Sequence, residues 1–246
     1  MKRFGKIFAI LMTGVMLCGT SAALAQPNES AAQGREDAAA AANDAKQPAE
    51  SAADTISVVC VGDSITAAGY PEALGTLLGE EYTVTNCGQP GTQMMSGARF
   101  SYMDQDVYQE SLDLAADYYI LMLGSNDSMT TAQWDPDLFR KDYTSFLESY
   151  VKLADSKIYV MIPPCVYKDE NPRMLSSRVD LDILYEEICP MISEIAQNHE
   201  VSVIDLHTLT DGHPEWLADG LHPNEEGNQN IAEYIYKTVF EETEGK

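Results

Sequence analysis

Four short polar segments carry the residue types that ester hydrolysis requires. They are Gly62-Asp63-Ser64, the stretch 86–91, the stretch 124–127 and the stretch 219–223. A serine hydroxyl is a weak nucleophile until a base removes its proton, and that base is usually a histidine oriented by a carboxylate. Asp219 and His222 lie three residues apart, a spacing that can place the carboxylate against the imidazole. We therefore take Ser64 as the candidate nucleophile, His222 as the base and Asp219 as its partner.

A tetrahedral intermediate also needs hydrogen-bond donors for its oxyanion. The backbone N–H groups of Ser64 and Gly91 and the side-chain amide of Asn126 are candidates for this role. Each residue also has a plainer interpretation. Ser64 can cap a helix, Asn126 can belong to a turn, and His222 can be a surface histidine.

Five apolar runs have the length and composition of buried β-strands. They are 56–62, 82–86, 118–123, 158–162 and 201–204. Helical signals separate them, at 71–78, from 135 to 154, at 181–195 and at 231–239. Alternation of uniformly apolar strands with helices indicates an α/β fold, a three-layer α/β/α sandwich with a five-stranded parallel sheet. The four polar segments should then meet near the carboxyl edge of that sheet.

The N-terminal part of the chain has the composition of an export signal followed by a spacer. Three basic residues, an apolar run and Ala23-Leu24-Ala25 predict a signal peptide over 1–25 that is cleaved after Ala25. The apolar run is short for a membrane span. Residues 26–54 are rich in alanine and acidic residues, which predicts a disordered linker. We expect the globular domain at 55–241, a short tail at 242–246, and a secreted or extracytoplasmic location.

The formal net charge of −24 argues against nucleic acid or anionic lipid as a partner, because both would be repelled. The sequence contains no Cys or Cys/His spacing typical of zinc, and His207, Asp211 and His213 fit no metal-ligand pattern in a segment read as a loop. We therefore expect neither a metal nor a cofactor. The sequence does not define an oligomeric state.

Taken in order, the motifs GDSIT (62–66), NCGQPG (86–91), GSND (124–127) and DGLHP (219–223) resemble the four blocks of the SGNH hydrolases, also called GDSL esterases. The resemblance implies a flavodoxin-like sandwich. It also implies Ser64 as nucleophile, Gly91 and Asn126 in the oxyanion hole, and the pair His222 and Asp219.

The stretches 122–134, 203–207 and 214–227 are similar to secreted bacterial carbohydrate O-acetylesterases, including sialate O-acetylesterase-like proteins. This similarity implies a small acylated substrate, most simply an O-acetylated carbohydrate. Two alternatives remain open. One is a lysophospholipase or thioesterase, and the other is a glycan-binding module that has lost its chemistry.

Four further side chains are candidates for substrate binding. Tyr167 and Arg173 follow the fourth strand, and Trp134 and Trp216 can stack on a sugar ring. The alternative for Arg173 is a surface ion pair, and the alternative for the two tryptophans is packing in the core or at the rim. The segment 92–106, rich in Met, Tyr and Gly, can line an acyl pocket or belong to the core.

Overall fold

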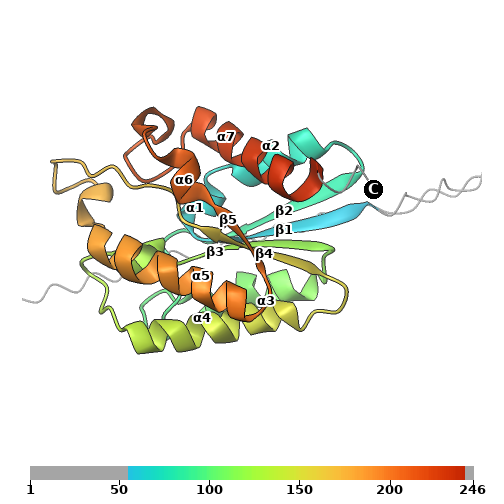
Figure 1. Cartoon of the computed structure of the whole chain (residues 1–246), viewed down its shortest axis with the longest axis horizontal. Coiled ribbons are helices and arrows are strands. Elements are labelled where there is room, and N and C mark those ends of the chain that lie inside the picture. Colours follow the sequence, from blue (N-terminus) through green and yellow to red (C-terminus); the bar gives the residue numbers. More distant parts are fainter. Residues whose placement is uncertain (1–54, 242–246) are drawn as a thin grey trace, which may run out of the picture. The chain divides into compact units, whose positions relative to one another are not determined.

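A computed structural model describes residues 55–241, and the predicted signal peptide, linker and tail lie outside this range. Five parallel strands form one sheet in the order β2-β1-β3-β4-β5 (Figure 1). Their bounds are β1 Ile56–Gly62, β2 Tyr82–Gly88, β3 Tyr118–Met122, β4 Lys157–Ile162 and β5 Ser202–Asp205. The predicted α/β class and five-stranded parallel sheet are confirmed.

Helices cover both faces of the sheet, which explains why the central strands are apolar on both sides. One layer contains α2 (Tyr70–Leu78) and α7 (Glu225–Ile235), and the other contains α3 (Asp106–Asp113), α4 (Pro136–Val151) and α5 (Cys189–Asn198) (Figure 1). Every residue of β3 is buried. The three predicted layers are therefore present.

Short helical turns complete the described part of the chain. They are α1 Ser64–Ala67, α6 Leu206–Thr210, and the turns η1 Tyr102–Asp104, η2 Ser125–Ser128, η3 Ser176–Arg178, η4 Ile183–Ile188, η5 Pro214–Trp216 and η6 Tyr236–Glu241. Most of these turns lie in the connections between the strands and the longer helices. Two of them, α1 and η2, hold candidate catalytic residues.

Helix α4 shows how the sequence directs the packing. Asp135 caps its N-terminus, where its carboxylate accepts hydrogen bonds from two backbone N–H groups of the first turn. The aromatic side chains on one face of α4 are all fully buried, and their rings contact one another at centroid distances of 5.1–5.9 Å. They are Phe139, Tyr143, Phe146 and Tyr150. This stripe fixes α4 against the sheet.

The helix predicted over 181–195 differs from a regular helix. Its first part, η4, is π-helical, and α5 begins only at Cys189. Pro190 explains the irregularity, because proline has no N–H to donate and its ring clashes with the preceding turn, which a wider turn relieves. The segment 207–213, expected to be a loop, also begins with α6, and α3 has no counterpart in the predicted elements.

The strand order places a topological switch point beside β1. Its neighbours are β2 on one side and β3 on the other, so the following connections leave in opposite directions and open a crevice at the carboxyl ends of β1 and β3. Ser64 follows β1 and Asn126 follows β3. The parallel register, which aligns Gly62 with both Gly88 and Met122, brings these segments to one edge of the sheet.

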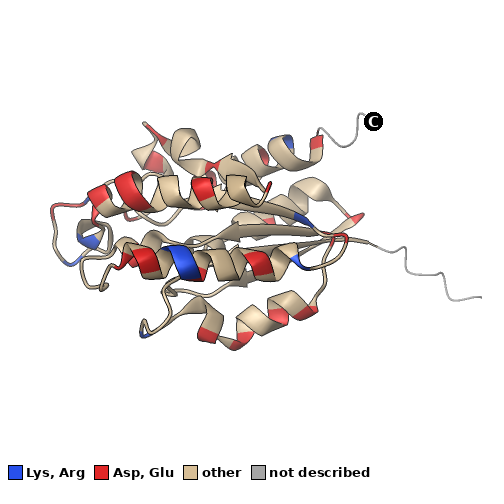
Figure 2. Ribbon diagram, turned by 60° about the horizontal axis from the view of Figure 1, so that its bottom comes forward, with Lys and Arg blue, Asp and Glu red and all other residues tan. Residues whose placement is uncertain are grey.

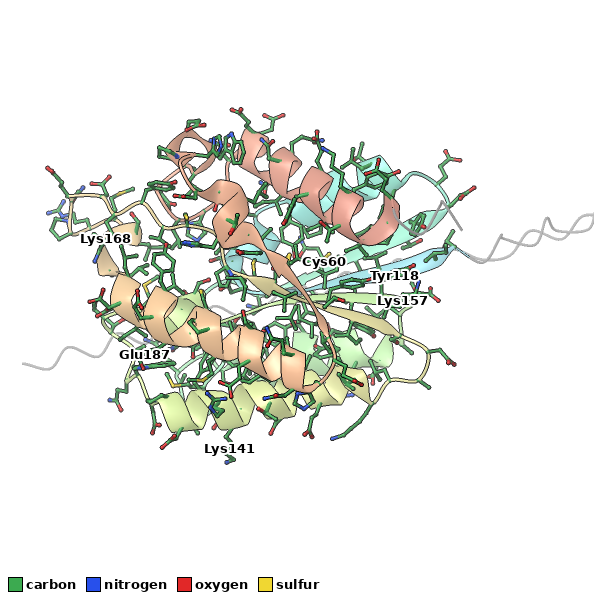
Figure 3. All side chains as sticks on the ribbon, in the orientation of Figure 1. Cys60, Tyr118, Lys141, Lys157, Lys168 and Glu187 are labelled. Carbon is green, nitrogen blue, oxygen red and sulfur yellow. The ribbon has the colours of Figure 1, made fainter. Side chains whose placement is uncertain are left out.

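Contacts away from this edge are structural. At the starts of β3 and β4, Lys157 Nζ donates to the Tyr118 hydroxyl at 2.9 Å, and Cys60 lies within the sheet (Figure 3). Burial raises the pKa of the Cys60 thiol far above its usual range, which makes it inert.

Acidic residues outnumber basic ones on the helices of both layers (Figure 2). Within residues 55–241, none of the helices has the length and apolar character needed to cross a bilayer.

Gly88 offers a test of how closely β2 approaches α1. A Cβ atom built on Gly88 would overlap the Ala67 backbone and lie 2.9 Å from its Cα. We predict that Gly88→Ala lowers the free energy of unfolding by about 1–3 kcal/mol, as measured by urea denaturation. The matched control is Gly75→Ala in α2, where the new methyl would lie 3.5 Å from Val84 and alanine favours the helix. Equal stabilities of the two variants would contradict this packing.

Candidate active site

Ser64 is the first residue of α1, directly after β1. The helix is capped by Asp63, whose Oδ1 accepts a hydrogen bond from the Ile65 N–H at 2.9 Å. The interpretation of Ser64 as a helix cap is therefore wrong, because the neighbouring carboxylate occupies that role. The Ser64 hydroxyl is left to interact with a residue from another part of the chain.

A continuous chain of hydrogen bonds joins Ser64, His222 and Asp219. Ser64 Oγ lies 2.9 Å from His222 Nε2, and His222 Nδ1 lies 2.8 Å from Asp219 Oδ2. An ionised carboxylate can only accept hydrogen bonds, so the Nδ1 proton faces Asp219 and Nε2 accepts from the serine hydroxyl. The His222 and Asp219 side chains are 23% and 24% exposed. The structure thus brings the three predicted residues together in the predicted order.

The charge of Asp219 depends on local hydrogen bonds. Partial burial acts to raise its pKa, but hydrogen bonds from the His222 backbone N–H and side chain outweigh burial and lower the pKa below its ordinary value. The backbone N–H groups of Leu221 and His222 both donate to Asp219 Oδ1, at 3.1 and 2.8 Å. The three-residue spacing therefore lets one carboxylate hold both the backbone and the ring of His222.

The loop that carries Asp219 and His222 is anchored by the loop after β4. The Tyr167 N–H donates to the Gly220 carbonyl at 2.8 Å, and Ser176 Oγ donates to the Asp219 carbonyl at 2.8 Å. Gly220 has a φ of 78°, and a Cβ there would overlap the Tyr167 carbonyl oxygen. Only glycine fits this position.

A further link joins the two ends of the domain. Asn228 in α7 donates from Nδ2 to the carbonyl of Ala68 at 2.9 Å, four residues after the nucleophile. Because α7 begins three residues after His222, this bond fixes the imidazole relative to Ser64.

Asn126 lies in η2, next to the same edge of the sheet. Its Nδ2 donates to the Thr92 carbonyl at 2.9 Å and lies 3.4 Å from Asp63 Oδ2. Gly91 precedes Thr92 and has a φ of 79°, with no atom within 4 Å of a Cβ built there. The requirement for glycine at position 91 is therefore its backbone conformation. The three predicted oxyanion donors lie on three segments, and the Asn126–Thr92 bond joins the segment of Asn126 to that of Gly91.

Two buried carboxylates support these segments. Asp127 is fully buried and accepts hydrogen bonds from the backbone N–H groups of Met94 and Met95 at 2.8–3.0 Å. Burial raises the pKa of Asp127 to about 7 and that of Asp63 to about 6, although backbone hydrogen bonds oppose the shift. Asp127 thus holds the backbone at 94–95, whereas Asp63 holds the Ile65 N–H beside Ser64 and contacts Asn126 Nδ2.

The family model described as GDSL-like Lipase/Acylhydrolase family matches residues 60–229. The chain belongs to this family. The family description names lipases and acylhydrolases, and the hydrogen-bonded serine and histidine are consistent with chemistry of that class.

Individual relatives of this GDSL-like acylhydrolase agree with that assignment. An acetylxylan esterase of Xylanibacter ruminicola is 28% identical over 215 residues, covering 76% of this chain and 43% of the relative. The chain thus spans less than half the length of this curated relative.

Solved structures confirm the fold. The native aryl esterase of M. smegmatis has a TM-score of 0.62 at 19% identity, covering 75% of this chain and 98% of that one. A carbohydrate acetylesterase family member from Sinorhizobium meliloti has a TM-score of 0.58 at 20% identity, covering 75% and 97%. The predicted SGNH sandwich is therefore confirmed.

The predicted substrate-binding side chains of this GDSL-like family member lie apart from the chain of hydrogen bonds that joins Ser64, His222 and Asp219. Trp134 packs on Phe139 and donates to Glu187, and the Trp216 ring stacks on His213 at 3.8 Å. The Tyr167 hydroxyl donates to the Thr210 carbonyl, and Arg173 is exposed. Within residues 55–241, none of these four side chains hydrogen-bonds to Ser64, His222 or Asp219.

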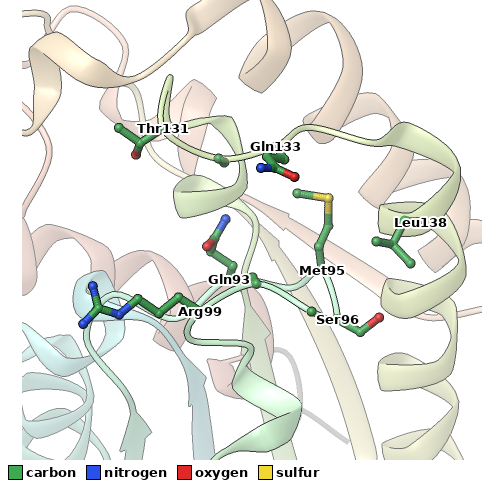
Figure 4. Close-up of a pocket in the computed structure, with 10 residues that line it drawn as sticks. Gln93, Met95, Ser96, Arg99, Thr131, Gln133 and Leu138 are labelled. Atoms are coloured by element: carbon green, nitrogen blue, oxygen red, sulfur yellow. The ribbon is translucent and has the colours of Figure 1, made fainter.

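A cavity of about 330 Å³ opens between the segment 93–99 and the loop before α4 (Figure 4). Gln93 and Met95 line it on one side, and Thr131 and Gln133 face them. Met94 and Tyr102 are buried in the core. The segment 92–106 therefore divides between cavity and core, and its part in an acyl pocket stays a prediction.

The roles of several residues that support the site are not predicted by the sequence. Asp63 and Asp127 stand inside the quoted motifs without an assigned role, and Asn228 was not singled out. A carboxylate directly after a buried strand is a usable signal, because it must find donors there. Asn228 carries no such signal, since its partner is 160 residues away.

The raised pKa of Asp127 predicts a pH-dependent stability. An unfolded aspartate titrates near 3.9, so folding takes up a proton at this site between about pH 4 and 7. Its contribution to stability is full below pH 4 and is lost as the pH rises toward 7. The unfolding free energy of the wild type minus that of Asp127→Asn should therefore fall by up to about 1.4 kcal/mol per pH unit in this window.

Urea denaturation at pH 4.5, 5.5 and 6.5 measures this difference. Asp137→Asn changes an exposed residue of α4 and is the control. The unfolding free energy of the wild type minus that of this variant should not fall with pH as it does for Asp127→Asn. A difference for Asp127→Asn that is constant or grows with pH would show that this carboxylate is already ionised in the folded protein at acidic pH.

Proposed function

We propose that the protein is a serine esterase that removes short acyl groups, most simply O-acetyl groups from carbohydrates, through Ser64, His222 and Asp219. The observation that carries the proposal is the pair of bonds at 2.9 and 2.8 Å from Ser64 Oγ through His222 to Asp219 Oδ2. A serine with no base would have no means of losing its proton at neutral pH.

In this proposal Ser64 Oγ attacks the ester carbonyl carbon while its proton passes to His222 Nε2. Collapse of the tetrahedral intermediate breaks the bond to the alcohol oxygen, which takes the proton from Nε2 and leaves. An acyl group remains on Ser64. Water then gives a proton to His222 Nε2 and attacks the acyl carbon. Collapse of this second intermediate breaks the bond between the acyl carbon and Ser64 Oγ, the acid is released, and Oγ takes the proton back from Nε2. Asp219 keeps the ring oriented and stabilises its positive charge.

The same proposal assigns the oxyanion to the N–H groups of Ser64 and Gly91 and to Asn126 Nδ2. The 2.9 Å bond to Thr92 engages one Asn126 hydrogen. The contact with Asp63 is long, at 3.4 Å, so the second hydrogen is available to a stronger acceptor. An oxyanion that develops in the transition state is such an acceptor.

Support for an acetyl substrate comes from the family and from the acetylxylan esterase relative. The basic, apolar and small-residue pattern of residues 1–25 supports export, where polymeric carbohydrates are accessible. We therefore include an extracytoplasmic place of action in the proposal.

Covalent labelling tests whether Ser64 is the nucleophile. A fluorophosphonate should label the wild type at Ser64 and should not label Ser64→Ala, which should lose activity by on the order of a thousandfold or more. Ser149→Ala removes a hydroxyl that only contacts the Phe146 carbonyl in α4 and should behave as wild type. A folded wild-type protein that resists labelling would favour the glycan-binding module.

Acyl-chain preference separates the acetylesterase from the lysophospholipase or thioesterase. We predict that kcat/KM on 4-nitrophenyl esters is highest for acetate and falls toward octanoate. Acetylated xylan, acetylated sialic acids and acetylated peptidoglycan fragments then compare acetate release from glycans. A kcat/KM that rises with chain length would reject the acetylesterase proposal.

A further inference from the structure

The cavity beside the candidate site has a lining suited to a polar, negatively charged ligand. Its ten lining residues include Gln93, Ser96, Thr131 and Gln133, whose side chains can donate hydrogen bonds, and one cation, Arg99. No Asp or Glu belongs to the lining, although the chain has 39 acidic residues. An anion that enters the cavity thus meets donors and a positive charge without a facing carboxylate.

Arg99 stands without an ionic partner. Within residues 55–241, the salt bridges of arginine and lysine involve Arg140, Lys152 and Lys237, and none involves Arg99. The Arg99 guanidinium lies 5.2 Å from the centre of the Phe100 ring, which is itself 49% exposed. A ring beneath the guanidinium restricts it without neutralising it. Arg99 therefore retains its capacity to bind a carboxylate in the bidentate manner that suits guanidinium.

The segment that carries Arg99 is held in place by hydrogen bonds from its backbone to two buried carboxylates. The N–H groups of Met94 and Met95 donate to Asp127, and the Ser96 N–H donates to Asp142 at 2.6 Å. Both carboxylates are buried and are not among the lining residues, so they face the backbone and not the cavity. The base of the segment is closed by hydrogen bonds between Gln93 and the backbone at 100 and 102. The cavity wall is thus a built part of the fold.

One hydrogen bond connects this wall to the catalytic groups. Gln93 Nε2 donates to the backbone carbonyl of Asn126 at 3.4 Å, and the Asn126 side chain in turn donates to the Thr92 carbonyl. Asn126 also lies beside Asp63, which precedes Ser64. Gln93 thus belongs both to the cavity lining and to the hydrogen bonds around Asn126, so the cavity adjoins the segment proposed to hold the oxyanion, although Ser64, Gly91 and Asn126 are not among its lining residues.

We propose that this cavity binds the sugar of the substrate through a carboxylate held by Arg99, so that the preferred substrates are O-acetylated acidic sugars. The inference rests on the proposed function and narrows its substrate class to glycans that contain a uronic or sialic acid. Gln93, Thr131 and Gln133 contact the sugar hydroxyls. In a protein of net charge −24, a dedicated arginine supplies the local attraction that an acidic ligand requires.

Paired substrates that differ only in charge test this assignment. An O-acetylated methyl hexuronoside and an O-acetylated methyl sialoside are each compared with the corresponding primary carboxamide, and released acetate is measured. The wild type should prefer one or both acids over their carboxamides by about tenfold or more in kcat/KM, because a charge-assisted bond is lost in the amide. Comparison of the two acids shows whether the preferred sugar is a uronic acid or a sialic acid.

Variants then locate the carboxylate. Arg99→Gln should reduce the acid-to-amide ratio to near one, and Arg99→Lys should retain part of it. Lys237→Gln alters the net charge equally but lies in η6 and should leave activity and ratio unchanged. A ratio lost in Arg173→Gln but kept in Arg99→Gln would overturn the proposal, as would a wild-type ratio near one. The wild-type ratio should also fall in 0.5 M NaCl through screening.

A binding measurement separates this inference from the proposed function. Calorimetry on Ser64→Ala compares the deacetylated sugar acid with its carboxamide, which requires no turnover. Tighter binding of the acid that depends on Arg99 supports the cavity assignment even if acetate release were to fail, and that failure would count against the esterase alone. Equal binding of acid and amide would overturn the cavity assignment, whatever the catalytic result.

Discussion

The hydrogen bond between Ser64 Oγ and His222 Nε2 joins residues that are 158 positions apart in the chain, and most of the described fold serves to maintain it. Parallel strands place the serine at one edge of the sheet, and α7 follows the histidine on the same side. The Asn228–Ala68 bond then connects the helix that follows His222 to the turn that follows Ser64. The distance between the two reactive atoms is therefore a property of the whole sheet and not of one loop.

Buried carboxylates form a second layer beneath these groups. Asp63 accepts from the Ile65 N–H beside Ser64, and Asp127 and Asp142 accept from backbone N–H groups of the segment 94–96. An uncompensated charge in this position would be costly, but several N–H donors can stabilise it, and a raised pKa lets Asp63 and Asp127 become neutral. These acids hold a loop by its backbone, so they leave the identity of the cavity side chains free to determine what binds.

The fold and the central site could be predicted from the sequence, because both depend on residue patterns that are local in the chain. Apolar runs predicted every strand to within two residues, and the spacing of Asp219 and His222 predicted their contact. The missing details depend on distant partners. The π-helical turn η4 is a response to Pro190, and the packing of Trp134 on Phe139 and of Trp216 on His213 has no local signature. The sequence does not single out Arg99, because whether an arginine has an ionic partner depends on contacts in the folded structure.

The contact of Gly220 with Tyr167 makes two loops interdependent. The loop after β4 donates through the Tyr167 N–H and the Ser176 hydroxyl to the loop that bears Asp219 and His222, and the space between the two backbones admits no side chain at position 220. A change in the length of either loop would move both. Related enzymes can therefore exchange these two loops only as a unit, and a chimera designed to acquire a new specificity must transplant them as a matched pair.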